Sequence, residues 1–87
     1  MDLNIIVIHP RDNVAVTVSE IKTGQAAAAA EGLTLTARTN IPRYHKIAVA
    51  RIPANNYVVK YGEVIGSAAH DIEPGEWVHA HNMKSEE

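Results

Sequence analysis

A five-residue pattern that recurs along this chain constrains its fold more than any other feature. In each copy an isoleucine precedes a polar segment, and glycine or asparagine stands three positions after it. The copies are residues 21–25, 52–56 and 72–76. Glycine adopts a positive φ at little cost and asparagine is the next best residue there, so Gly24, Asn55 and Gly75 fit one recurrent tight turn. Chance is the alternative, since turns are generally rich in these residues, but the constant isoleucine offset favours a real repeat.

Short apolar segments between the turns predict strands. Residues 5–8 are a β-branched run that ends at His9 and Pro10, where a turn is expected. Residues 13–18 alternate with a period of two, which predicts a half-buried strand, antiparallel to the first, with Val14, Val16 and Val18 on one face. Further strands are expected at residues 47–50, 57–62 and 64–69. Many short strands with frequent turn signals predict a small, bent, all-β domain.

The alanine run at residues 26–30 allows two interpretations. Alanine is the best helix former, yet glycines flank the run and so short a helix is marginal. We favour a strand that leads through Glu31 and Gly32 into a second extended segment at residues 33–37. Residues 39–46 are expected to form a polar loop, and residues 85–87 a frayed tail.

Length and composition exclude several classes of protein. Eighty-seven residues make a single domain, residues 1–87, whose ordered core we expect at about residues 4–84. So small a core favours a partner or a homo-oligomer. The chain has no cysteine, a formal net charge of −2 and no basic cluster, so disulfides and nucleic acid are not expected. It shows no signal peptide and no apolar run of membrane-spanning length, which predicts a cytoplasmic protein without membrane contact.

The C-terminal motif at residues 73–82, a proline-glycine turn followed by a short strand, is the first candidate site. On a strand, side chains two residues apart share a face, so His79 and His81 would project together with Trp77, beside the amide of Asn82. Two imidazoles on one face suit a metal ion or an anionic sugar acid. The alternative is a solvated strand end that binds nothing.

Three other polar groups are candidates. His45 and Lys46, at a junction of loop and strand, could meet a carboxylate or simply lie on the surface. Lys60 and Tyr61 would project from opposite faces of a strand, with or without a ligand. His9 lies near Asp12 in a polar cluster that a capped turn also explains. The chain has no recognisable nucleophile elbow, phosphate-binding loop or set of three metal ligands, so it suits a part of an enzyme better than a complete one.

The motifs, taken in order, resemble one family over residues 6–84. They are His9 with Asp12-Asn13-Val14, Ile41-Pro42 with His45-Lys46-Ile47-Ala48, Lys60-Tyr61-Gly62 with Ile65-Gly66, and Gly75-Glu76-Trp77-Val78-His79 with His81-Asn82. This order is similar to the small N-terminal domain of altronate dehydratase. It also resembles the small subunit of sulfolactate sulfo-lyase and the N-terminal part of galactarate dehydratase.

The resemblance implies a SAF-type domain of the β-clip fold in a lyase that removes water or sulfite from a sugar acid or a related acid. It implies a larger catalytic subunit that holds most of the active site and a divalent metal, Fe²⁺ or Mn²⁺. This chain would then be a small subunit or an excised domain, inactive alone. The residues expected at the seam with the larger subunit are His45, Lys46, His79 and His81. Those expected to contact substrate are His9, Lys60, Tyr61 and Asn82.

The expected roles differ within these sets. Lys46 would neutralise the substrate carboxylate, a histidine would donate the leaving-group proton, and His79 and His81 are the candidate metal ligands. The base is not assigned. One departure from the family pattern is Tyr44, which stands where glycine is usual, so the loop that carries His45 is expected to be reshaped. The alternatives are a sulfo-lyase subunit, a non-catalytic sugar-acid-binding or assembly module, and a free-standing metal protein.

Overall fold

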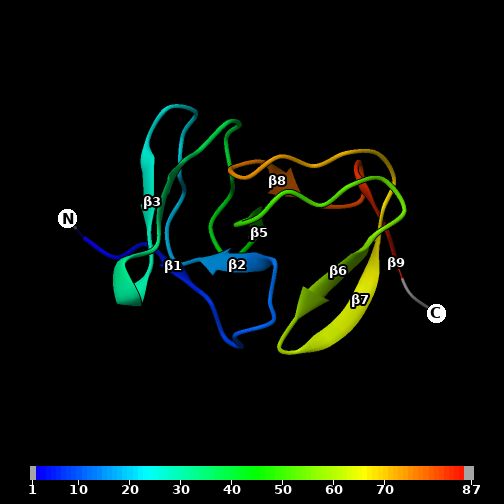
Figure 1. Ribbon diagram of the computed structural model, residues 1–87. Helices are drawn as coiled ribbons and strands as arrows, with labels where there is room; N and C mark the ends of the chain where they lie inside the picture. Colours follow the sequence, from blue (N-terminus) through cyan, green and yellow to red (C-terminus); the bar gives the residue numbers. More distant parts are fainter. Residues whose placement is uncertain (1, 86–87) are drawn as a thin grey trace.

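A computed structural model describes residues 2–85, and its short antiparallel strands confirm the expected all-β fold (Figure 1). The strands are β1 (Ile5–Ile6), β2 (Val14–Thr17), β3 (Ala26–Ala28), β4 (Thr34–Thr36), β5 (Lys46–Ala48), β6 (Tyr57–Lys60), β7 (Glu63–Ala68), β8 (Trp77–Val78) and β9 (Met83–Ser85). One 3-10 turn, η1 (Ala30–Gly32), joins β3 to β4. Within the described residues no helix is long and apolar enough to cross a membrane.

The strands form three small antiparallel sheets. The central sheet has the order β1-β2-β5-β8, and the pairing of β1 with β2 is antiparallel as expected. The β3–β4 hairpin lies at one end of the molecule and the β6-β7-β9 sheet at the other (Figure 1). The central sheet therefore has a neighbour at each end, and its strands join the two halves of the molecule.

The recurrent turn is confirmed, and there is a fourth copy that the sequence analysis missed. Gly24, Asn55 and Gly75 all have positive φ, at 88°, 70° and 94°. The fourth copy is at residues 41–45, where Tyr44 has a φ of 66°. All four isoleucines are buried and they pair in twos, Ile21 with Ile41 and Ile52 with Ile72. The isoleucine begins each turn because it anchors that turn in the core.

Each turn is held to a neighbouring segment by the same two hydrogen bonds. The N–H of the positive-φ residue donates to a backbone carbonyl 2.8 Å away, and the carbonyl of the next turn residue accepts from the same partner. The four partners, in order of the turns, are Ala37, Thr17, Ala68 and Ala48. Since the left-handed residue aims its N–H at the partner, the conformation of one residue fixes the position of the strand that follows each turn.

The expectation that Tyr44 reshapes its loop is wrong. Tyr44 adopts the left-handed conformation itself, and its N–H donates to Thr17 at the distance seen in the other three turns. Its side chain is 65 % exposed, with the Arg43 guanidinium 4.4 Å from the ring centroid, so the bulky group meets no core atoms. The residue bears the conformational cost of a positive φ, and the turn keeps its shape.

The core consists of two clusters, one on each face of the central sheet. Ala15 of β2 joins Ile5, Ile21, Ile41 and Ile47 in one cluster, while Val14 joins the other cluster. The members of that second cluster are Val14, Ala48, Ile52, Val58, Ala68, Ile72 and Val78. The alternation in β2 thus gave a wrong burial pattern, because Val16 is half-buried and Val18 exposed while Ala15 and Thr17 are buried.

Several boundaries differ from the sequence expectation. The first strand ends at Ile6, so residues 7–8 are not part of it. The alanine run is a strand only over β3 and then enters η1, and the hairpin with β4 follows. Lys46 begins β5 instead of ending a loop. Ser85 pairs with Gly66 in the β9 edge and is not frayed, while residues 86–87 lie outside the described residues.

We expect Tyr44→Gly to raise the free energy of unfolding by up to about 1 kcal/mol, because glycine takes positive φ without the steric cost that tyrosine pays. The measurement is chemical denaturation. The matched control is Tyr57→Gly, since Tyr57 is similarly exposed, at 61 %, but lies in strand β6, where glycine lowers stability. Equal losses in both variants would mean that Tyr44 is not strained.

Candidate functional site

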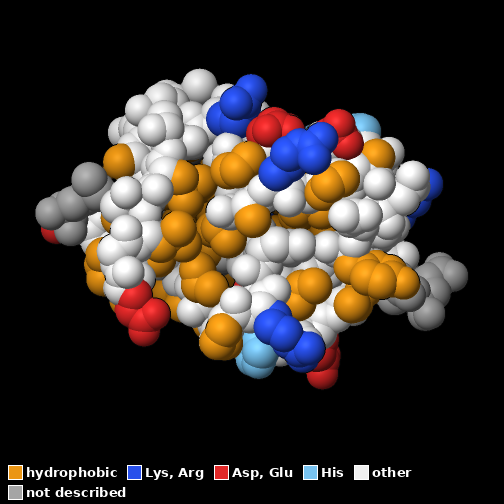
Figure 2. All heavy atoms as spheres, in the orientation of Figure 1, with side chains coloured by type: hydrophobic (Ala, Val, Ile, Leu, Met, Phe, Trp, Pro, Cys, Tyr) orange, Lys and Arg blue, Asp and Glu red, His pale blue; other side chains and the backbone are white. Residues whose placement is uncertain are grey.

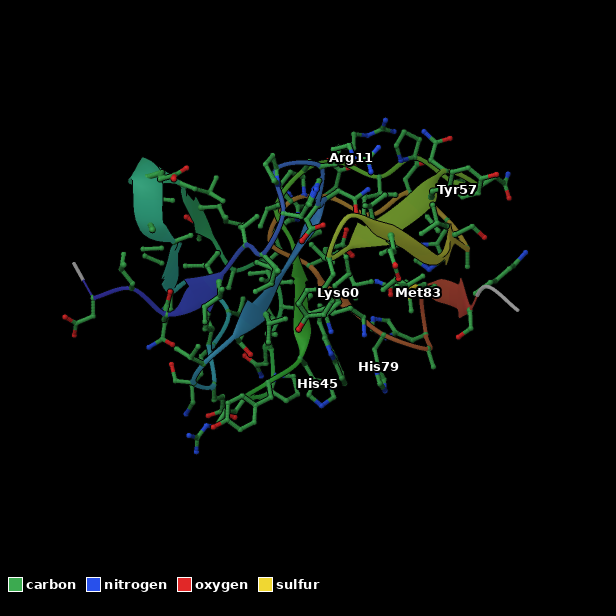
Figure 3. All side chains as sticks on the ribbon, turned by 90° about the horizontal axis from the view of Figure 1, so that it is seen from below. Arg11, His45, Tyr57, Lys60, His79 and Met83 are labelled. Atoms are coloured by element: carbon green, nitrogen blue, oxygen red, sulfur yellow. The ribbon has the colours of Figure 1, made fainter. Side chains whose placement is uncertain are left out.

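Trp77 is the centre of a cluster of aromatic and imidazole rings, which we call the Trp77 cluster: His45, Trp77, His79 and His81. The Trp77 ring stacks on His79, with centroids 5.4 Å apart and an interplanar angle of 9°. His81 tilts toward Trp77 at 5.1 Å and His45 meets it edge-on at 5.6 Å. His45 and His79 are themselves 5.1 Å apart and project from the same edge of the molecule (Figure 3). The three histidines that the sequence analysis expected at the seam with a larger subunit therefore lie together.

His79 and His81 lie together, but not on one face of a strand as the sequence predicted. Strand β8 ends at Val78, and a turn follows it, in which the carbonyl of His79 accepts hydrogen bonds from the N–H groups of Asn82 and Met83. The Asn82 side chain holds this turn, because its Oδ1 accepts from the His79 N–H and its Nδ2 donates to the Trp77 carbonyl. Asn82 is buried and its amide is engaged, so it positions His79 instead of facing a ligand.

His45 is fixed by its turn and by the tryptophan. Its N–H lies 3.2 Å from the hydroxyl of buried Thr17, which itself donates to the Pro42 carbonyl. The Trp77 indole Nε1 donates to His45 Nδ1 at 3.2 Å. An indole N–H can only donate, so Nδ1 accepts and the neutral ring carries its proton on Nε2. The ring is thus held in one tautomer by Trp77.

Lys46 and Lys60 bring two ammonium groups to the same region. Lys46 is half-buried at the start of β5, and burial, together with the nearby charge of Lys60, lowers its pKa. Among residues 2–85 the ion pairs are those of Arg51 with Asp71 and Glu73, so neither lysine has a carboxylate partner there. Two neighbouring positive charges without a counter-ion favour the binding of an anion.

Lys60 and Tyr61 are not on opposite faces, as a continuous strand would have placed them. Strand β6 ends at Lys60, and Tyr61 opens the turn to β7 with a φ of 57°. The Lys60 Nζ therefore lies over the Tyr61 ring, 4.9 Å from its centroid, and Tyr61 is exposed. The Tyr61 ring therefore lies next to Lys60, one of the two lysines.

His9 lies in a turn and makes its contacts within that turn and with Gly62 of the β6–β7 turn. The Arg11 N–H donates to His9 Nδ1, and the His9 ring packs against Gly62, where a Cβ atom would clash with it. Asp12 holds this turn to the β6–β7 turn by accepting from the N–H groups of His9 and Gly62. Burial raises the pKa of Asp12, but the amides of Gly62, Tyr61 and His9 and the His9 charge outweigh it, so the pKa is lowered. The contacts of His9 identify it as part of a capped turn.

The described residues do not form a complete metal centre. Iron and manganese sites in proteins take several imidazole and carboxylate ligands, and no group of three His, Cys, Asp or Glu side chains within residues 2–85 could hold an ion. His45 Nδ1 is already engaged by the indole. His79 and His81 could add at most a partial ligand set to a centre held elsewhere.

Three site features were missed from the sequence. Trp77 was placed beside the histidines but not as their common contact, and the approach of Lys46 to Lys60 joins residues far apart in the chain. Asp12 was expected in a polar cluster or a capped turn near His9, but its hydrogen bond from the N–H of Gly62, far along the chain, was not expected. The fourth turn, which was also missed, did have a signal in the sequence. Ile41 stands three positions before Tyr44, as the isoleucine does in the other copies.

Comparisons with known proteins agree with this arrangement of motifs. The sequence model of the family described as altronate/galactarate dehydratase SAF domain matches residues 3–86. Altronate dehydratase of Bacillus subtilis is 41 % identical over 80 residues, which cover 92 % of this chain and 16 % of that protein. Galactarate dehydratase (L-threo-forming) of Escherichia coli is 40 % identical over 73 residues, 84 % of this chain and 14 % of that protein. This chain thus spans about a sixth of the dehydratases that it matches.

A third relative is a separate subunit. The (2R)-sulfolactate sulfo-lyase subunit alpha of Paracoccus pantotrophus is 45 % identical over 51 residues, which are 59 % of this chain and 76 % of that subunit. The matched proteins therefore include both long single chains and a short subunit.

We expect Lys60→Ala to raise the pKa of Lys46, because the variant removes the neighbouring positive charge, while the effect of burial remains. The measurement is NMR titration of the lysine side-chain resonances. Lys22→Ala, which removes an exposed lysine elsewhere, is the control. An unchanged Lys46 titration in Lys60→Ala would show that the two ammonium groups do not interact.

We expect Asp12→Asn to lower the free energy of unfolding by about 1 kcal/mol at neutral pH, since it weakens two charge-assisted hydrogen bonds in a partly exposed site. A lowered carboxyl pKa contributes stability above the unfolded value, which is lost as the pH falls through the folded value. Denaturation at a series of pH values should therefore show the difference shrinking in acid. Asp2→Asn, at an exposed carboxylate, is the control, and a constant difference across pH would contradict the charge effect.

Proposed function

Because this chain belongs to the altronate/galactarate dehydratase SAF domain family, we propose that it is part of a hydro-lyase that dehydrates a sugar acid. The single observation that carries the proposal is the pair of neighbouring lysines, Lys46 of β5 and Lys60 of β6, which lacks a counter-ion within residues 2–85. A sugar acid has a carboxylate for the ammonium groups and hydroxyls for the imidazoles. The remaining catalytic groups would come from a larger polypeptide.

The proposed reaction is a β-elimination of water. A base removes the proton next to the carboxylate, the electrons of that C–H bond form a C=C bond, and the C–O bond at the neighbouring carbon breaks. Negative charge grows on the carboxylate side in this step, and Lys46 and Lys60 would stabilise it. We assign no base within this chain, and a divalent metal, if the enzyme uses one, would be held mainly by the larger polypeptide and would help the hydroxyl to leave.

His79 is the proposed donor of the proton that leaves with the hydroxyl. Its ring is exposed and stacks on Trp77 without using either nitrogen in a hydrogen bond to the described residues. His45, by contrast, is held by the indole at Nδ1 and presents only Nε2–H. His45 and His81 would therefore orient the substrate hydroxyls, while His79 can rotate a protonated nitrogen toward the leaving oxygen.

Elimination of sulfite is a second candidate function. The observation that favours it is the similarity to a sulfo-lyase subunit over 76 % of that subunit's length, against 16 % for the altronate dehydratase. Both reactions need a cationic site for an acid, so the lysine pair serves either one. A binding or assembly module without a catalytic role would use the lysines and leave His79 idle.

We expect altronate to change the fluorescence of Trp77, the only tryptophan of the chain, because three imidazoles of the proposed site contact its ring. Titration with altronate should saturate, and Lys46→Gln should weaken binding at least about tenfold by removing a charge-assisted contact. Galactarate and sulfolactate are offered in parallel to separate the two lyase functions.

Two controls give this titration its meaning. Lys22→Gln removes an exposed lysine outside the site and should bind as the unaltered chain does. Altritol has the hydroxyls without the carboxylate and should not saturate the signal. Equal binding of altronate and altritol, or no effect of Lys46→Gln, would contradict the proposed carboxylate site. With the catalytic polypeptide added, His79→Ala should lower turnover and leave altronate affinity nearly unchanged.

A further inference from the structure

An apolar groove runs along β1, away from the Trp77 cluster. It has a volume of about 560 Å³ and lies between residues 3–10 and the end of the β3 segment at residues 29–31. Three of its large side chains are well exposed, Leu3 at 58 %, Ile6 at 47 % and Ile8 at 48 %. Figure 2 shows hydrophobic side chains gathered over this part of the molecule. Single exposed apolar residues are ordinary, but a contiguous apolar hollow marks a surface that binds something.

The groove is continuous with the lysine site through the central sheet. Residues paired directly across antiparallel strands point to the same face, and the pairing joins Ile6 to Val16 and Val16 to Lys46. Along β2 this face is covered at Val14, half-covered at Val16 and open at Val18, which also lines the groove. One face of the sheet thus carries apolar side chains and then the Lys46 ammonium group.

We infer that this groove, which we call the β1 groove, is the docking surface for the larger catalytic polypeptide of the lyase. The inference rests on the proposed function, and adds the face by which this domain meets its partner. An apolar segment of that polypeptide fills the β1 groove, and the same polypeptide extends along the row from Ile6 to Lys46. It thereby closes over the lysine pair and the substrate carboxylate.

The catalytic polypeptide suits this surface better than a second copy of the chain. The altronate dehydratase relative has more than four-fifths of its length outside the matched segment, so a domain of this kind has a large neighbour in the enzyme. A second copy would cover the groove with an identical surface, and residues 2–85 of either copy form no group of three His, Cys, Asp or Glu side chains that could hold a metal ion. The continuity of the groove with Lys46 gives the partner access to the site.

The test uses a defined probe, the Bacillus subtilis altronate dehydratase without the segment that matches this chain. Binding of the full 87-residue chain is followed by calorimetry at several temperatures, and burial of the groove should give a negative heat-capacity change. The double variant Ile6→Lys, Ile8→Lys should bind at least about 30-fold more weakly, because it places two charges in the apolar interface. Val64→Lys changes an exposed valine that does not line the groove, and should bind normally.

The two proposals fail in different ways. In the isolated chain, where the probe takes no part, Lys46→Gln should weaken altronate binding measured by Trp77 fluorescence, so unaffected binding would count against the carboxylate site alone. The docking surface is overturned if the double variant binds as tightly as Val64→Lys, or if the unaltered chain does not bind the probe at micromolar concentration. It is also overturned if sedimentation shows a homodimer of the unaltered chain that the double variant dissociates. Circular dichroism of each variant confirms that the fold is intact.

Discussion

The structure depends on one local constraint, the left-handed residue in each of four turns. A positive φ aims the N–H of that residue at the carbonyl of a neighbouring segment, and the next carbonyl accepts from the same neighbour. Because a buried isoleucine stands three positions earlier, each turn is tied both to the core and to a strand. With strands of only two to six residues, such ties replace the long hydrogen-bonded ladders that hold larger sheets.

The candidate site arises where two of these turns meet. The turns at Tyr44 and Gly75 lead into β5 and β8, and these strands pair so that Lys46 lies opposite Val78 and Ile47 opposite Trp77. The fifth position after each turn isoleucine is the same place in the scaffold, and it carries a different side chain each time. These residues are Ala26, Lys46, Tyr57 and Trp77. The backbone of the turn repeats four times. The candidate site uses the side chains at two of these copies, Lys46 and Trp77.

The sequence carried enough information for most of the strands and three of the turns, because both depend on local preferences, but β9 was not expected. It could not give the burial of β2, since this strand has core on both faces and the small residue Ala15 is as deep as Val14 on the other face. It also placed His79 and His81 on a strand, where alternation would align them. The side chain of Asn82 instead closes a turn after Val78, and the rings meet through contact with Trp77. Contacts between distant segments, such as Lys46 with Lys60, have no local signal.

One face of the central sheet carries both an ammonium group without a counter-ion in the described residues and apolar side chains that are open to water. Lys46 is half-buried beside a like charge, so its ammonium loses hydration without gaining a carboxylate within the described residues. Along the same face, Val16, Ile6 and Val18 leave apolar surface open to water. Each feature lowers the stability of the isolated fold, and a chain with a small core has little stability to lose. A binding surface explains both at once, since an anion satisfies the lysines and an apolar partner covers the valine and isoleucine side chains.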